Sequence, residues 1–186
     1  VGRKLHHIGA PKDMPFFSDF ADDLAQVAAT QPPFTLVPLT EAEGIICTGL
    51  ADDLNETPDD YRATLLMAKN LGLPMLCANP DIVVHWGDKL LYCAGALAKA
   101  YEDMGGTALY FGKPHPPIYD LARRRLALLG GRDDGAILAI GDGIATDIQG
   151  AMAENLDAVF VTGGIDHAAF GNDSDNYLYG NVGPNG

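Results

Sequence analysis

Residues 139–147 read Ala-Ile-Gly-Asp-Gly-Ile-Ala-Thr-Asp, an apolar strand that turns through glycine and aspartate into the start of a helix. Such turns are typical of parallel sheets in α/β proteins, where ligands bind beyond the carboxyl ends of the strands. Asp142 and Asp147 are close enough in sequence to bring two carboxylates to one side of a cation. Taken alone, each has an ordinary explanation, because Asp147 can cap a helix and Asp142 can serve as a turn residue.

Strand-like and helical patterns alternate along the rest of the chain, which predicts an α/β fold with a parallel, Rossmann-like sheet. The cleanest stretch begins near residue 108, where we expect one strand-helix-strand-helix-strand unit. Its expected elements are strands 108–111, 136–140 and 158–161 and helices 117–129 and 147–155.

Upstream of that unit, local signals mark helix starts, helix ends and turns. The expected elements are a helix striped by Phe17, Phe20, Leu24 and Val27, a strand at 44–48, a helix that begins at Thr57 and Pro58, buries Tyr61, Leu65, Ala68 and Leu71 and ends at Gly72, a strand at 74–77, a hairpin at 82–92 that turns near Gly87 and Asp88, and a helix striped by Leu97, Tyr101 and Met104 that ends at Gly105.

A lysine follows the expected strand 108–111, in the sequence Gly112-Lys113-Pro114. A lysine and an acid at neighbouring strand ends, with glycines that let the backbone approach closely, can form a phosphate and metal site. Lys113 beside a proline is by itself more often a solvated loop residue. The order in which lysine, aspartate and a second aspartate follow the strands favours the functional interpretation.

The composition excludes several classes of partner. A formal net charge of -13 on 186 residues repels nucleic acid. No apolar run approaches the roughly 20 residues of a membrane span, and no signal sequence opens the chain, so we expect no membrane association and a cytoplasmic location. The three scattered cysteines predict small buried side chains in a reducing compartment, not disulfides or a zinc site.

Five short motifs together resemble the haloacid dehalogenase superfamily, in particular its subclass IIA, which includes NagD-like and 4-nitrophenylphosphatase-like enzymes. The motifs occur in the family's order and at similar spacing, and the similarity is strongest over residues 74–165. They are Asn79-Pro80-Asp81, Gly95-Ala96-Leu97, Gly112-Lys113-Pro114, Gly141-Asp142 with Thr146-Asp147, and Thr162-Gly163.

The resemblance implies a Rossmann-like core, incomplete at the N-terminus, that carries an inserted α/β cap. Residues 1–9 would be a remnant of a core strand, 10–106 the cap, and 107–186 the C-terminal part of the core. The implied activity is Mg²⁺-dependent hydrolysis of small phosphorylated metabolites through an aspartyl-phosphate, in a protein whose homodimerisation is compatible with the family. The implied site residues are Lys113 (catalytic), Asp142 and Asp147 (metal), and Asn79, Asp81, Gly112 and Pro114 (substrate).

One family motif is absent from the sequence. The nucleophile of the family lies in Asp-x-Asp-Gly, and the nearest string here, Asp133-Asp134-Gly135, has the wrong spacing and precedes its strand. We expect the nucleophile to lie upstream of Val1, in a chain that is a fragment. The alternative is a non-catalytic binding or regulatory protein that has lost it. A dinucleotide-binding domain is disfavoured because no Gly-x-Gly-x-x-Gly follows a strand.

Overall fold

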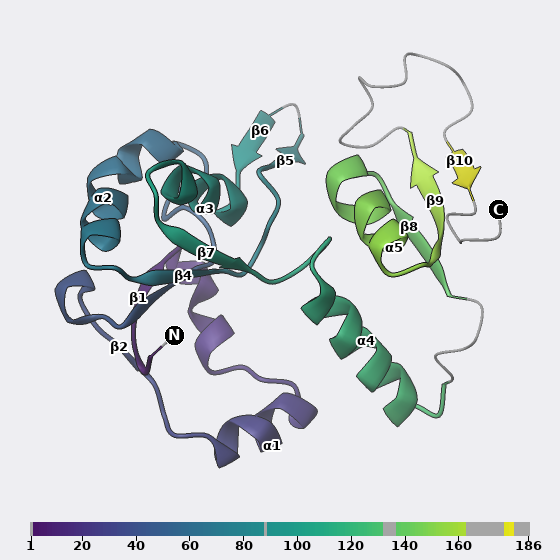
Figure 1. Cartoon of the computed structure of the whole chain (residues 1–186), viewed down its shortest axis with the longest axis horizontal. Coiled ribbons are helices and arrows are strands. Elements are labelled where there is room, and N and C mark those ends of the chain that lie inside the picture. Colours follow the sequence, from purple (N-terminus) through teal and green to yellow (C-terminus); the bar gives the residue numbers. More distant parts are fainter. Residues whose placement is uncertain (1, 88, 132–136, 163–176, 181–186) are drawn as a thin grey trace. The chain divides into compact units, whose positions relative to one another are not determined.

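The computed structural model describes residues 2–87, 89–131, 137–162 and 177–180. The chain forms two compact units, Val1–Tyr110 and Phe111–Gly186 (Figure 1). No helix in the described ranges is both long enough and apolar enough to cross a membrane.

The first unit is built on a five-stranded parallel sheet with the order β2-β1-β3-β4-β7. Its strands are β1 (Lys4–Ile8), β2 (Thr35–Leu36), β3 (Gly44–Cys47), β4 (Pro74–Cys77) and β7 (Thr107–Tyr110). The chain passes from β1 to β2 on one side and then crosses to β3 on the other, so the strand order reverses between β1 and β3. Such a reversal opens a crevice at the carboxyl ends of the two strands.

Helices α2 (Arg62–Asn70) and α3 (Ala94–Asp103) pack together, and α3 lies against β3, β4 and β7 (Figure 1). The core between these helices and the sheet contains the fully buried side chains of Ile45, Met75 and Leu97. The Tyr101 hydroxyl, also in the core, donates to the Leu73 carbonyl at 2.6 Å. The remaining elements of this unit are α1 (Asp22–Thr30), the hairpin of β5 (Val83–Trp86) and β6 (Lys89–Tyr92), and 3-10 helices at Pro11–Phe17, Leu39–Glu41 and Pro58–Tyr61.

The second unit contains a three-stranded sheet with the order β10-β9-β8. Strand β8 (Leu138–Gly141) runs parallel to β9 (Asp157–Val161), whereas β10 (Tyr177–Gly180) is antiparallel to β9. Helix α4 (Pro116–Leu128) precedes β8, and a π-helical turn (Ile144–Ile148) leads from β8 into α5 (Gln149–Ala153).

The α/β class with a parallel sheet is confirmed, as are the hairpin at β5 and β6 and the helix ends at Gly72 and Gly105, both of which have positive φ angles. The interpretation of residues 108–161 as one sheet unit was wrong. Strand β7 pairs with β4 in the first unit, because Ala108 and Tyr110 pack against the core of that unit.

Two helix predictions were also wrong in detail. Phe17 ends a 3-10 helix instead of lying in an α-helix, and α1 begins only at Asp22. In α2, Leu65 and Ala68 are buried as expected, whereas Leu71 is 47% exposed just past the helix end. The domain boundaries inferred from the resemblance stay a prediction; β1 pairs with β2 and β3 in the first unit.

Candidate functional site

Lys113 and Asp147 form an ion pair in the second unit. The Lys113 Nζ donates to Asp147 Oδ1 at 2.5 Å. The lysine side chain is 48% exposed, whereas the aspartate side chain is only 9% exposed. A positive charge that faces solvent is therefore anchored by a buried carboxylate, which is a suitable arrangement for contacting an anion.

The second oxygen of Asp147 is bound by the backbone of the turn after β8. Its Oδ2 accepts N–H groups from Asp142 at 3.2 Å and from Gly143 at 3.0 Å. Gly141 makes this closure possible, because a Cβ at that position would lie 2.1 Å from Asp147 Cγ. The carboxylate thus ties the lysine to the end of the strand.

The π-helical turn explains how Asp147 reaches back to the strand. The N–H of Asp147 donates to the Gly143 carbonyl at 2.8 Å, and the N–H of Ile148 donates to the same carbonyl at 3.1 Å. A π-helical turn is wider than an α-helical one and is often found at functional sites. The predicted helix start at Asp147 was therefore wrong, since Asp147 lies inside a turn that begins at Ile144.

Helix α4 supports the lysine loop by close packing on α5. A Cβ on Gly150 would lie 1.9 Å from the Tyr119 hydroxyl and 3.2 Å from Pro114 Cα, so a larger residue there would displace the tyrosine. Burial raises the pKa of Tyr119, and the Asp147 charge adds to the shift, so the phenol stays neutral. Arg123 and Glu154 form a second ion pair in this unit.

Asp142 follows β8 directly and is half-buried. Its carboxylate is the hard oxygen ligand that Mg²⁺ prefers, and one or two such groups suffice when water and a substrate phosphate complete the shell. Within the described ranges, no three His, Cys, Asp or Glu side chains gather as a metal cage. Both Asp147 oxygens already accept protein hydrogen bonds, which favours a positioning role for this residue.

The predicted substrate residues lie in both units. Gly112 and Pro114 flank Lys113 in the second unit. Asn79 and Asp81 follow β4 in the first unit, where Asn79 Oδ1 accepts the Asp81 N–H at 3.1 Å. Their roles stay predictions. Thr162 follows β9, and Gly163 lies outside the described residues.

Two of the sequence motifs pack directly on each other. The Gly95 N–H donates to the Asp81 carbonyl at 3.1 Å, and a Cβ on Gly95 would lie 2.1 Å from the Pro80 carbonyl oxygen. The joint occurrence of the Asn79-Pro80-Asp81 turn and the Gly95 motif therefore has a packing cause.

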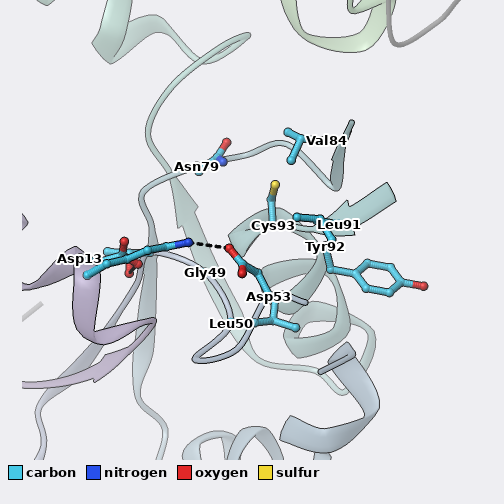
Figure 2. A pocket seen from close by; sticks show the side chains of 11 residues that line it. Asp13, Gly49, Leu50, Asp53, Asn79, Val84, Leu91, Tyr92 and Cys93 are labelled. Atoms are coloured by element: carbon cyan, nitrogen blue, oxygen red, sulfur yellow. Dashed lines mark hydrogen bonds and ion pairs between the residues drawn. The ribbon is translucent and has the colours of Figure 1, made fainter. Parts of the chain in front are cut away.

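Sequence reasoning missed a hollow in the first unit, beyond the carboxyl ends of β1, β3 and β4 (Figure 2). Of its lining residues only Asn79 was predicted to belong to a site. The signal was available, because each polar residue follows a strand that ends at the crevice. The lining comprises Lys12, Asp13, Thr48, Gly49, Leu50, Asp53, Asn79, Val84, Leu91, Tyr92 and Cys93.

The chain is similar to known proteins both in sequence and in structure. A model of the HAD-hydrolase-like family matches residues 110–177, which include the Lys113–Asp147 pair. No curated protein matches the chain with significance. A crystal structure of a hydrolase of the haloacid dehalogenase-like family from Brucella suis 1330 is 42% identical, with a TM-score of 0.76, over 91% of this chain and 61% of that one.

Two further solved structures show the same fold. A thermostable NPPase from Geobacillus stearothermophilus is 25% identical, with a TM-score of 0.54, over 75% of this chain and 53% of that one. A glycerol phosphate phosphatase from Mycobacterium tuberculosis, in complex with magnesium, is 22% identical, with a TM-score of 0.54, over 89% of this chain and 45% of that one. The chain thus spans less than two thirds of the length of these structures.

Proposed function

This chain belongs to the haloacid dehalogenase-like hydrolases, and from that premise we propose that the protein is a Mg²⁺-dependent phosphatase of small phosphorylated metabolites. The observation that carries the proposal is the Lys113–Asp147 pair, held by two backbone N–H groups at the end of β8. The magnesium complex of the M. tuberculosis phosphatase supports the choice of metal. The three free, buried cysteines support the proposal of a reducing cytoplasm.

In this proposal, each residue of the site has a separate task. Lys113 holds a phosphate oxygen and balances its charge, and Asp147 fixes the lysine in place. Asp142 holds the metal, which when bound supplies positive charge against the phosphate oxygens. Gly112 and Pro114 shape the loop that carries Lys113 toward the phosphate.

The proposed route passes through an aspartyl-phosphate. The attacking carboxylate forms a bond to phosphorus while the ester oxygen leaves with its electron pair, and water then releases phosphate. The sequence contains no Asp-x-Asp-Gly, so the nucleophile of this route is not supplied by that motif here. A non-catalytic binding protein is the alternative outcome of the test.

The test is hydrolysis of 4-nitrophenyl phosphate by the protein, with and without Mg²⁺. Lys113→Ala and Asp142→Asn should each lower kcat by about a hundredfold or more, because the first removes the charge that balances the phosphate and the second removes the carboxylate proposed to hold the metal. Lys99→Ala is the matched control, since it removes an exposed lysine that pairs with Asp103 in the first unit. Hydrolysis that survives both site substitutions would falsify the assignment, and phosphate binding without turnover would favour the non-catalytic alternative.

A further inference from the structure

Helix α4 follows directly on the loop that carries Lys113, so the position of the helix governs the position of the lysine. Lys113 lies three residues before Pro116, where α4 begins. Within the ranges that the structure describes, none of the side chains of α4 is buried, so apolar packing holds the helix only weakly. Individual side-chain contacts therefore decide where α4, and with it Lys113, lies.

Two contacts join α4 to α5 and the residue that follows it. The Tyr119 hydroxyl lies against Gly150, where a Cβ would come within 1.9 Å of it. Four residues further along both segments, Arg123 Nη1 donates to Glu154 Oε2. Because residues four apart lie on the same side of a helix, Tyr119 and Arg123 present one face of α4 to α5.

The Arg123–Glu154 ion pair is well enclosed for a pair between two helical segments. The arginine side chain is 30% exposed and the glutamate side chain 13% exposed, whereas Lys99 and Asp103 are 62% and 64% exposed. An enclosed pair is costly to break, because the remaining charge stays in a poorly solvated place. This pair can therefore fix the spacing of its two helices.

Tyr119 connects these contacts to the Lys113–Asp147 pair. A Cβ on Gly150 would also lie 3.2 Å from Pro114 Cα, so the tyrosine, the glycine and the lysine loop meet at one place. Burial is the largest cause that raises the pKa of Tyr119; Asp147 adds to the shift and Lys113 opposes it. The phenol is thus close enough to the pair to respond to both charges.

We propose that Tyr119 and Arg123 are positioning residues for Lys113, which fix α4 on α5 and thereby hold the lysine beside Asp147. The inference rests on the proposed phosphatase function, in which Lys113 meets a phosphate oxygen. Neither residue touches the substrate in this scheme, so each acts through the lysine. Moving a group that contacts the reacting phosphate lowers kcat, because its interactions are strongest in the transition state.

The first test measures hydrolysis of 4-nitrophenyl phosphate with Mg²⁺ in variants of the arginine. Arg123→Ala should lower kcat about tenfold, and Arg123→Lys, which keeps the charge, should retain at least about a third of kcat. In the Lys113→Ala background, Arg123→Ala should cause no further loss, because no lysine is left to position. Arg124→Ala removes the neighbouring exposed arginine and should leave kcat unchanged.

The second test concerns the tyrosine and uses a rescue. Gly150→Ala should lower kcat about tenfold, because the new methyl group displaces the Tyr119 hydroxyl and with it the lysine loop. Tyr119→Phe removes that hydroxyl and leaves the ring carbon Cζ, 2.9 Å from the Cβ position, as the nearest atom. The double variant should therefore regain at least about threefold in kcat over Gly150→Ala, whereas damage confined to α5 would not be relieved by a change on α4.

The third test needs no substrate. The backbone N–H groups of Asp142 and Gly143 donate to Asp147 Oδ2, so their NMR signals report the surroundings of that carboxylate. Lys113→Ala removes the lysine charge and should shift both signals. Arg123→Ala should shift them in the same direction by a smaller amount, because the lysine then leaves the carboxylate for part of the time.

The NMR result separates a failure of this inference from a failure of the phosphatase assignment, since it is obtained equally from a protein that hydrolyses no phosphate. The inference is overturned when both signals stay in place in Arg123→Ala although they move in Lys113→Ala. In an active protein it is also overturned when kcat of Arg123→Ala stays within about twofold of the unmodified protein, or when the losses from Arg123→Ala and Lys113→Ala multiply in full.

Folding of every variant is checked by circular dichroism. Where Arg123→Ala does not fold, Gly150→Ala decides by the same two NMR signals. The part assigned to the tyrosine fails when Tyr119→Phe brings no recovery to Gly150→Ala, either in kcat or in the position of these signals.

Discussion

Each unit holds a lysine–aspartate ion pair beyond its strand ends, and the two pairs differ in what surrounds the carboxylate. Lys12 and Asp53 are 66% and 34% exposed at a distance of 2.7 Å, whereas Asp147 is almost fully enclosed beside Lys113. Asp147 receives two backbone N–H groups, and Asp53 receives none among the described residues.

The difference shows that a lysine–aspartate pair can have different roles in different surroundings. An exposed pair contributes little to stability, because water solvates both charges and both side chains lose freedom on pairing. A buried carboxylate must keep all its donors, since each lost partner leaves charge in a poorly solvated place. We therefore interpret Asp147 as a fixed support for Lys113, and Asp53 as the partner of a solvent-exposed lysine.

Replacing the two aspartates in turn should give the largest difference between the units. Asp147→Asn should lower the free energy of unfolding by about 2–3 kcal/mol, because the amide cannot satisfy both the lysine and the backbone donors. Asp53→Asn should cost no more than about 0.5 kcal/mol. Urea unfolding followed by circular dichroism measures both values.

Equal losses from these two substitutions would contradict the comparison. Asp103→Asn provides the baseline, because its pair with Lys99 is more exposed than either of the others. It should lie within experimental error of the unmodified protein.

The glycines at the two strand ends provide the next test. Gly141→Ala should cost about 2 kcal/mol, because its Cβ would overlap the Asp147 carboxylate. Gly49, two residues after β3, has nothing within 4 Å of the position that a Cβ would take, so Gly49→Ala should be nearly neutral. Thermal unfolding of both variants measures which of the two has lost more stability. A Gly141→Ala protein as stable as Gly49→Ala would mean that Asp147 does not lie against the strand end.

The sequence predicted the parts of the molecule that depend on local chemistry. Thr57 and Asp60 form a reciprocal cap, with the Thr57 N–H donating to Asp60 Oδ2 at 2.8 Å, and Gly72 ends the following helix as expected. The spacing of Lys113 and Asp147 was also informative, because the side chains do meet.

What failed depends on contacts between distant segments. Strand β7 looks the same in sequence whether it joins β4 or β8, and burial of Tyr110 against the first core decides between them. The hollow joins Lys12, Asp53 and Asn79 from three separate segments, and each is an ordinary polar residue when viewed alone. The π-helical turn at Ile144–Ile148 likewise has no pattern that distinguishes it from a helix start.

The smallest expected effect concerns pH and the first unit alone. Burial lowers the pKa of His7 below its ordinary value of 6.5, an effect to which His6 adds and which Asp13 opposes. The folded protein therefore binds fewer protons than the unfolded chain in the range just below pH 6.5. The free energy of unfolding should be fully retained above pH 6.5 and should fall as the pH drops through the folded pKa.

His7 Nε2 lies 2.9 Å from Thr48 Oγ1. His7→Gln isolates the effect of pH, because glutamine can keep a hydrogen bond to Thr48 without titrating. The free energy of unfolding is measured in urea by the fluorescence of Trp86, the single tryptophan and a residue of the first unit. In this variant it should lose part of its dependence on pH below about pH 6.5. The second unit's response to Asp147→Asn should show no such change when His7 is replaced. An identical pH profile in His7→Gln would mean that burial does not lower the pKa of His7 in the folded protein.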